Sequence, residues 1–132
     1  MKLLEMAFDN GSNNDNLPFY YDKNCVVYGG THDNETLAGF FAHQKRTLLS
    51  FAREYLKVRT NKEIPWAIIR TAYQSTANTV IFQVQDLLGL DNSARINTPS
   101  TIGGNWKWRL TGDQLTTGLA RKLKRLTEIY GR

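Results

Sequence analysis

The stretch that decides the fold reads Cys25–Val26–Val27–Tyr28–Gly29–Gly30–Thr31–His32–Asp33–Asn34–Glu35–Thr36. It begins with an apolar run and turns abruptly polar after two glycines, which predicts a buried strand over residues 24–28. The carboxyl ends of strands are where parallel α/β sheets and barrels place their chemistry. We therefore expect a functional loop directly after this strand, with His32 and Asp33 as its first candidates.

Two further apolar runs predict the neighbouring strands. Residues 3–8 are apolar up to Asp9, and residues 9–16 are rich in turn formers, which indicates a strand followed by a long loop. Residues 79–84 are β-branched and aromatic and predict a third strand. Apolar strands separated by helical stretches favour a parallel sheet with helices outside it, an α/β fold.

The helices are predicted from periodicity. Apolar residues recur at spacings of three and four over residues 35–56, which fits one helix or two in succession, and Pro65 fits the first turn of another. Residues 85–110 are expected to be irregular. A last helix is expected from Thr111, which has capping-box spacing to Gln114. Its apolar face would hold four leucines: Leu115, Leu119, Leu123 and Leu126.

Composition limits the classes of protein that fit. The 132 residues, 41% of them hydrophobic, suffice for one domain, and no apolar run approaches a membrane span. The first residues do not resemble a secretory signal, and the single cysteine, Cys25, is expected to be a buried apolar residue. We expect a cytoplasmic protein that does not bind membranes.

The net charge of +5 is unevenly spread. Residues 1–40 hold two basic and six acidic side chains, whereas residues 95–132 hold eight basic and two acidic ones. The basic excess falls on the last helix, where a solvated face is the simpler interpretation. Nucleic-acid binding would leave the acidic first part unexplained, so we expect none.

Side chains able to bind the hydroxyls of a sugar gather after all three predicted strands. They are Asp9, His32, Asp33, Asn34, Gln85, Asp86 and Asn97. The pair His32–Asp33 by itself fits a hydrogen-bonded turn as well as a functional site, and the density of the set raises the second interpretation. A metal site is not expected, because only His32 and His43 exist and neither has a second imidazole or thiol at ligand spacing.

A second polar and aromatic cluster covers residues 95–99 and 103–109. Trp106 and Trp108 would share one side of an extended segment, where core packing is favoured over stacking on a sugar. Gly103 and Gly104 do not form a phosphate loop, because no Gly-Lys-Ser/Thr follows them.

The chain resembles the carboxyl-terminal portion of the amylomaltases, or disproportionating enzymes, which are 4-α-glucanotransferases of the α-amylase clan. Five ordered blocks carry the resemblance: residues 1–8, 27–36, 85–90, 95–99 and 104–109. Ile96 and Ser100 depart mildly from the family pattern. The resemblance implies that residues 1–132 are an incomplete domain, about three β/α units (the sixth to eighth strand regions) of a (β/α)₈ TIM barrel.

The family's chemistry would then be divided between this chain and a part upstream of it. Retaining glycoside chemistry needs a carboxylate nucleophile and a second carboxyl acid/base, and the resemblance implies that both lie upstream. It implies that Asp33 stabilises the transition state, that His32 donates a hydrogen bond beside it, and that Asp9, Asn34 and Asn97 bind substrate. The expected substrate is a maltooligosaccharide or another α-1,4-glucan, with no cofactor, and the chain alone is expected to be inactive.

A different class of function stays open. The same loops could form a non-catalytic glucan-binding α/β module. It would be either a natural short product or one piece of an assembly. For the chain in either class, the expected protein partner is the missing amino-terminal part of the barrel or a second copy bound through the open sheet edge.

Overall fold

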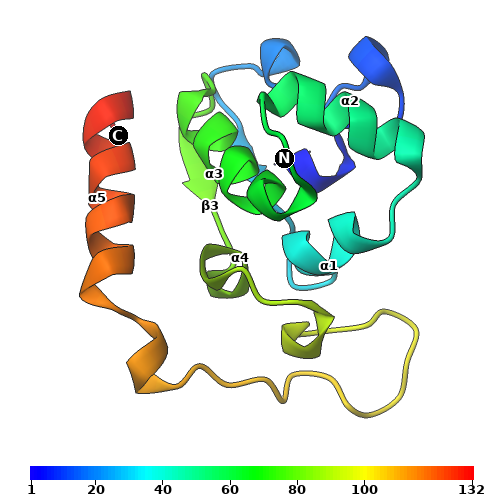
Figure 1. Ribbon diagram of the computed structural model, residues 1–132, viewed down its shortest axis with the longest axis vertical. Coiled ribbons are helices and arrows are strands. Elements are labelled where there is room, and N and C mark those ends of the chain that lie inside the picture. The colour runs from blue at the N-terminus through cyan, green and yellow to red at the C-terminus, as the bar shows by residue number, and fades with distance from the viewer.

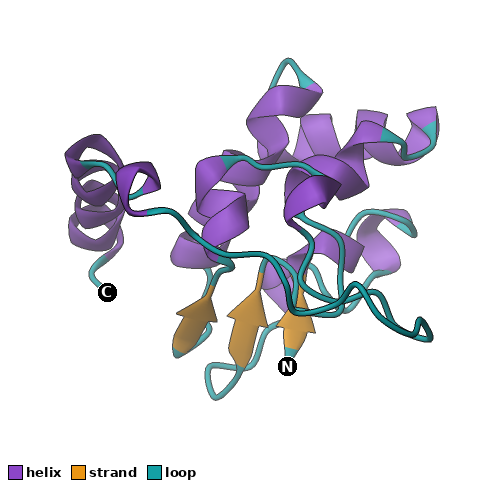
Figure 2. Cartoon of the chain, turned by 90° about the horizontal axis from the view of Figure 1, so that it is seen from below, coloured by secondary structure: helices purple, strands orange, loops and turns teal.

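The computed structural model of the chain describes all residues 1–132. Its sheet has three short strands: β1 (Lys2–Leu3), β2 (Val26–Tyr28) and β3 (Thr79–Ile81). They lie side by side in the order β1-β2-β3, and both pairings are parallel, with Val27 opposite Lys2 and Val80 (Figure 2). The predicted parallel α/β arrangement is confirmed, although each strand is shorter than its apolar run.

Five α-helices follow the strands. They are α1 (Leu37–Ala42), α2 (Arg46–Leu56), α3 (Ile64–Gln74), α4 (Val84–Leu88) and α5 (Thr117–Tyr130). The periodic stretch 35–56 thus forms two helices, and Pro65 lies in the first turn of α3 as expected. No helix is both long and apolar enough to cross a membrane.

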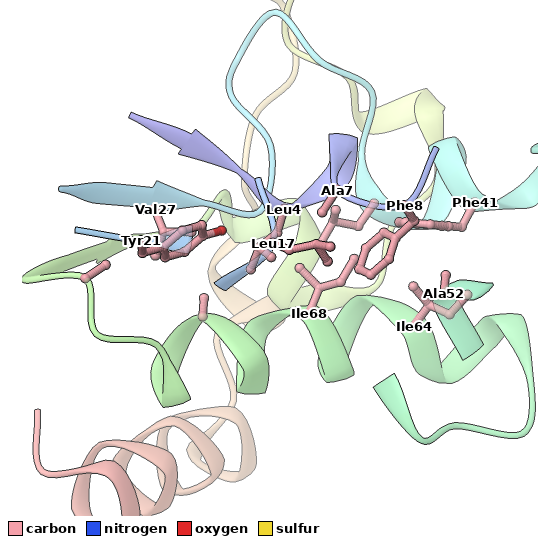
Figure 3. Close-up of a cluster of buried hydrophobic side chains, with 13 residues drawn as sticks. Leu4, Ala7, Phe8, Leu17, Tyr21, Val27, Phe41, Ala52, Ile64 and Ile68 are labelled. Atoms are coloured by element: carbon pink, nitrogen blue, oxygen red, sulfur yellow. The ribbon is translucent and has the colours of Figure 1, made fainter. Parts of the chain in front are cut away.

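The core lies between the sheet and α3. Leu4, after β1, and Leu17, in the connection to β2, lie near Ile68 of α3, and Val27 of β2 lies beside Tyr21 (Figure 3). Leu4, Leu17, Val27 and Ile68 are fully buried. At the other end of this cluster the Phe8 ring packs edge-on against Phe41 of α1, with 6.0 Å between centroids. Burial of these apolar side chains fixes the first 80 residues as one unit.

The structure differs from the prediction at three elements: the first strand, the segment that follows β3, and the start of the last helix. Strand β1 ends at Leu3, and a 3₁₀ turn over Leu4–Met6 replaces the rest of the predicted strand. Helix α4 occupies residues predicted to be irregular. Gly89, with φ of 66°, ends that helix by donating its N–H to the carbonyls of Gln85 and Asp86, and this is a conformation that glycine adopts at little cost.

The last helix also begins later than predicted. The capping box of Thr111 and Gln114 is present, but it caps a 3₁₀ turn at Gly112–Gln114, while the Thr116 side chain caps α5. Leu115 therefore lies outside the helix and is exposed. In Figure 1, α5 stands beside α3 and is joined to the rest by a long irregular segment that passes below α4 and the adjoining 3₁₀ turn.

Candidate active site

The site is built on the glycines that end β2. Gly29 accepts a hydrogen bond from the Glu5 backbone N–H at 2.9 Å, and a Cβ on Gly30 would lie 2.8 Å from the Glu5 carboxylate oxygen Oε2. Only glycine fits there without displacing this buried acid. The chain leaving β2 therefore passes directly over Glu5 before it turns outward.

The next residues form a tight polar turn. Asn34 Oδ1 accepts from the Thr31 backbone N–H at 2.8 Å and from the Thr31 hydroxyl at 2.7 Å, and the Asn34 backbone N–H donates to the Thr31 carbonyl. This turn presents His32 and Asp33, whose side chains are 52% and 51% exposed. The predicted functional loop is thus an exposed turn that directly follows the buried residues Gly29 and Gly30.

The Asp33 carboxylate is held from two sides. Asn97 Nδ2 donates to Asp33 Oδ1 at 2.7 Å, and His32 Nε2 lies 3.3 Å from the same oxygen. Both contacts use Oδ1, so Oδ2 stays available to a ligand. A fixed, half-exposed carboxylate of this kind can accept hydrogen bonds from sugar hydroxyls or stabilise a developing positive charge.

Asn97 belongs to the second predicted cluster, which the fold brings onto the first. Its backbone N–H donates to the His32 carbonyl at 3.2 Å, and the Trp106 N–H donates to the Ile96 carbonyl at 2.7 Å. Two segments more than sixty residues apart in sequence are therefore joined at the site, as the sequence predicted.

Trp106 corrects the prediction of core packing. It is 57% exposed, and its ring lies 5.2 Å from the His32 ring between centroids. Its φ of 62° breaks the extended conformation that would have put Trp106 and Trp108 on one side; Trp108 is half-buried. The exposed indole gives the site an apolar face beside its polar groups.

A cavity of about 450 Å³ opens at this end of the sheet. His32 and Asp33 line it together with Tyr28 of β2, Ile81 of β3 and the residues that follow β3. Its lining combines polar loop groups with the exposed face of the strands, a combination that suits an amphipathic ligand such as a sugar ring.

Gln85 and Asp86 do not join the exposed site, contrary to the prediction from their position after β3. Both are buried: Gln85 Nε2 donates to the Ala94 carbonyl at 3.1 Å, and Asp86 Oδ1 accepts from the Leu37 N–H at 2.7 Å. Burial raises the pKa of Asp86 to about 6, against the opposing effect of the Leu37 hydrogen bond. These two side chains therefore hold the backbone of Ala94 and of Leu37 in place.

Glu5 is the residue that the sequence analysis missed. It is 1% exposed, and burial, followed by the nearby charges of Asp86 and Glu35, raises its pKa to about 8. The signal was available, since Glu5 is the one charged residue inside the apolar run 3–8. A buried titratable group next to an exposed polar turn is typical of functional sites.

Asp9 and Asn34 are not placed around the Asp33 carboxylate by their side-chain contacts. Asp9 Oδ1 accepts from Asn14 at 2.6 Å, and Asp9 lines a separate cavity of about 420 Å³ with Phe8 and Lys45. The side-chain oxygen of Asn34, Oδ1, accepts both of its hydrogen bonds from Thr31, within its own turn. Their role in substrate binding stays a prediction. No group of three His, Cys, Asp or Glu side chains is arranged to hold a metal ion.

Comparison with known proteins identifies the family. The family model described as 4-alpha-glucanotransferase matches residues 1–116. This chain belongs to the 4-alpha-glucanotransferase family. Among its relatives, the 4-alpha-glucanotransferase of Clostridium butyricum is 46% identical over the whole chain, and that of Thermus thermophilus is 36% identical.

A solved glucanotransferase structure agrees with this assignment. The amylomaltase from Streptococcus agalactiae, in complex with acarbose, superposes on the whole chain with a TM-score of 0.94 at 37% identity. The chain spans about a quarter of the length of its relatives, 27% of both the Clostridium protein and the Streptococcus structure. The resemblance predicted from the five sequence blocks is therefore confirmed.

The family occurs in more than one compartment. A 43% identical relative from Arabidopsis thaliana is named as a chloroplastic/amyloplastic 4-alpha-glucanotransferase. The cytoplasmic location expected from the sequence stays a prediction.

Proposed function

We propose that this chain forms the carboxyl-terminal β/α units of a (β/α)₈ barrel that transfers α-1,4-glucan segments between maltooligosaccharides. The observation that carries the proposal is the Asp33 carboxylate, fixed by Asn97 and His32 through one oxygen and open through the other. The similarity to a structure with acarbose, described as an amylomaltase complex, supports a glucan as the ligand.

In this proposal Asp33 acts on the sugar at which the glycosidic bond breaks. A retaining double displacement passes through oxocarbenium-like transition states on the way to and from a covalent glycosyl intermediate. Asp33 Oδ2 would accept hydrogen bonds from sugar hydroxyls, and its negative charge would stabilise the positive charge as it develops. His32 and Asn97 would keep the carboxylate oriented.

The nucleophile and the acid/base would come from the upstream part of the barrel. The open face of the sheet supports this division: Ile81 of β3 is 44% exposed, as expected of a surface that further strands cover. The exposed Trp106 indole, next to His32, would stack on the apolar face of a sugar ring.

A maltotriose disproportionation assay tests this function. It should be run on this chain alone and on an extended protein, in which the upstream part of the Clostridium butyricum relative precedes the chain. We expect glucose and longer oligosaccharides only from the extended protein. Activity of the short chain, or none from the extended protein, would contradict the proposal.

Asp33→Asn gives the matching test of the residue. The amide cannot stabilise a cation, so we expect turnover of the extended protein to fall about 10²–10³-fold, as for other preorganised electrostatic groups. Asp22→Asn, an exposed loop aspartate, is the control and should leave turnover unchanged. Equal thermal unfolding midpoints would show that neither change acts through the fold; full activity of Asp33→Asn would remove Asp33 from the mechanism.

A glucan-binding module is the second candidate. It is favoured by one observation: a cavity of about 450 Å³ beside His32 and Asp33 is present in this part of the protein. Calorimetric titration of acarbose into the short chain would detect such binding. Binding without activity in either protein would favour the module over the transferase.

A further inference from the structure

Arg95 connects the two segments that form the site. Its Nη2 donates to the Asp33 carbonyl at 2.8 Å, and its Nε donates to the Asn97 carbonyl at 2.8 Å. One planar guanidinium thus binds the backbone of both residues whose side chains meet at Asp33 Oδ1. The spacing of these two carbonyls is set by the fixed geometry of the guanidinium group.

The backbone around Arg95 is held by hydrogen bonds. The Arg95 N–H donates to the Asn92 carbonyl at 3.1 Å, and the preceding residue, Ala94, is buried with its carbonyl bound by Gln85. The Asn92 side chain in turn accepts from the Thr36 N–H at 3.2 Å. The guanidinium therefore reaches the exposed loop from a backbone that the packed part of the fold holds in place.

No ion pair accounts for Arg95. No carboxylate oxygen lies within ion-pair distance of its guanidinium, since the four ion pairs of the chain are formed by other residues. Both of its bonds go to backbone carbonyls of site residues.

We infer that Arg95 is a positioning residue, which sets the Asp33 carboxylate by clamping the backbone of Asp33 to that of Asn97. The inference rests on the proposed function of Asp33. Without the clamp, the exposed turn at residues 31–34 would still form, because Thr31 and Asn34 close it internally. The Asp33 carboxylate, however, would shift relative to the Asn97 side chain, and small displacements of a catalytic group lower the reaction rate strongly.

The test compares Arg95→Gln with Arg53→Gln in the extended protein. Arg53 of α2 is also half-buried and also makes a hydrogen bond, to Asn61 Oδ1 at 2.8 Å, but it lies outside the site. We expect Arg95→Gln to lower kcat about 10–100-fold with KM changed less than about twofold. Arg53→Gln should leave both constants unchanged. Arg95→Lys should recover little, since one ammonium cannot span both carbonyls as the planar fork does.

A double-mutant cycle with Asp33→Asn separates positioning from general stabilisation. If Arg95 acts through Asp33, then Arg95→Gln should lower kcat less than about threefold further in the Asp33→Asn protein. Additive losses, or a lower unfolding midpoint with kcat unchanged, would overturn the inference. Failure of the unchanged extended protein to disproportionate maltotriose would overturn the proposed function itself, so the two failures are distinguishable.

Discussion

Residues 1–94 and residues 95–132 are held in place by different forces. Of the 24 buried residues, Leu126 alone lies beyond Ala94. The first region forms its own hydrophobic core, whereas the second meets it through hydrogen bonds at the site and one side of α5. The site therefore lies on the boundary between the two regions. The turn at residues 31–34 follows the packed strand β2, whereas residues 95–99 are held to it by hydrogen bonds.

The exposed side chains of the second region fit this division. Ile102, Leu115 and Ile129 are exposed, and part of the contact between α5 and α3 is polar: the Tyr130 hydroxyl accepts hydrogen bonds from Arg70 and Gln74. None of these three apolar side chains belongs to the hydrophobic core.

The largest effect should come from removing a side chain of the packed region. Ile68 is fully buried, so Ile68→Ala should lower the free energy of unfolding by about 2–5 kcal/mol. Ile102→Ala, the same change at a fully exposed position, should lower it by less than about 0.5 kcal/mol. Urea denaturation of the extended protein measures both changes in the free energy of unfolding. Equal losses would mean that Ile102 is covered and that the second region is packed like the first.

A smaller effect is expected at the end of the first region, where α1 packs against the 3₁₀ turn Asn92–Ala94 that precedes Arg95. A Cβ on Gly39 of α1 would overlap the Asn92 side chain, at 2.0 Å from its Oδ1. Gly39→Ala should therefore cost about 1–3 kcal/mol through overpacking.

Gly118→Ala is the matched control for Gly39→Ala. Gly118 lies in α5, where a Cβ would meet only Thr116 Oγ1 at 3.7 Å, so alanine should add about 0.5–1 kcal/mol. Thermal unfolding of the two variants should shift in opposite directions. A destabilised Gly118→Ala protein would contradict the open environment of α5.

The effect that is smallest in acid concerns Glu5. Its pKa is raised from 4.5 to about 8, so the folded protein binds this proton more tightly than the unfolded chain. Its stabilising contribution is complete below pH 4.5 and is lost as the pH rises through about 8.

Glu5→Gln should remove this dependence. The variant should unfold near the wild-type temperature at pH 4 and at a higher temperature at pH 9. Glu128→Gln on α5, where Glu128 is exposed and pairs with Lys124 at 3.9 Å, should leave the wild-type slope unchanged. Parallel curves for Glu5→Gln and the wild type would show that Glu5 is not buried as an acid.

The sequence alone determined the class of fold and the family. Apolar runs ending in polar turns identified the three parallel strands, because a strand buried on both faces needs continuous apolar residues. Five local blocks identified the 4-alpha-glucanotransferases, and the turn with His32 and Asp33 was found from its position after β2.

Only the tertiary structure decided which side chains meet. Gln85 and Asp86 looked equivalent to Asp33 in sequence but are buried supports, since the Gly89 cap folds their segment into α4. Trp106 became an exposed neighbour of His32 through one positive φ. Arg95 gained its two acceptors because Ala94 is anchored in the core, sixty residues from the turn that it clamps. Local pattern encodes elements, whereas contacts between distant segments depend on packing that no single stretch of sequence contains.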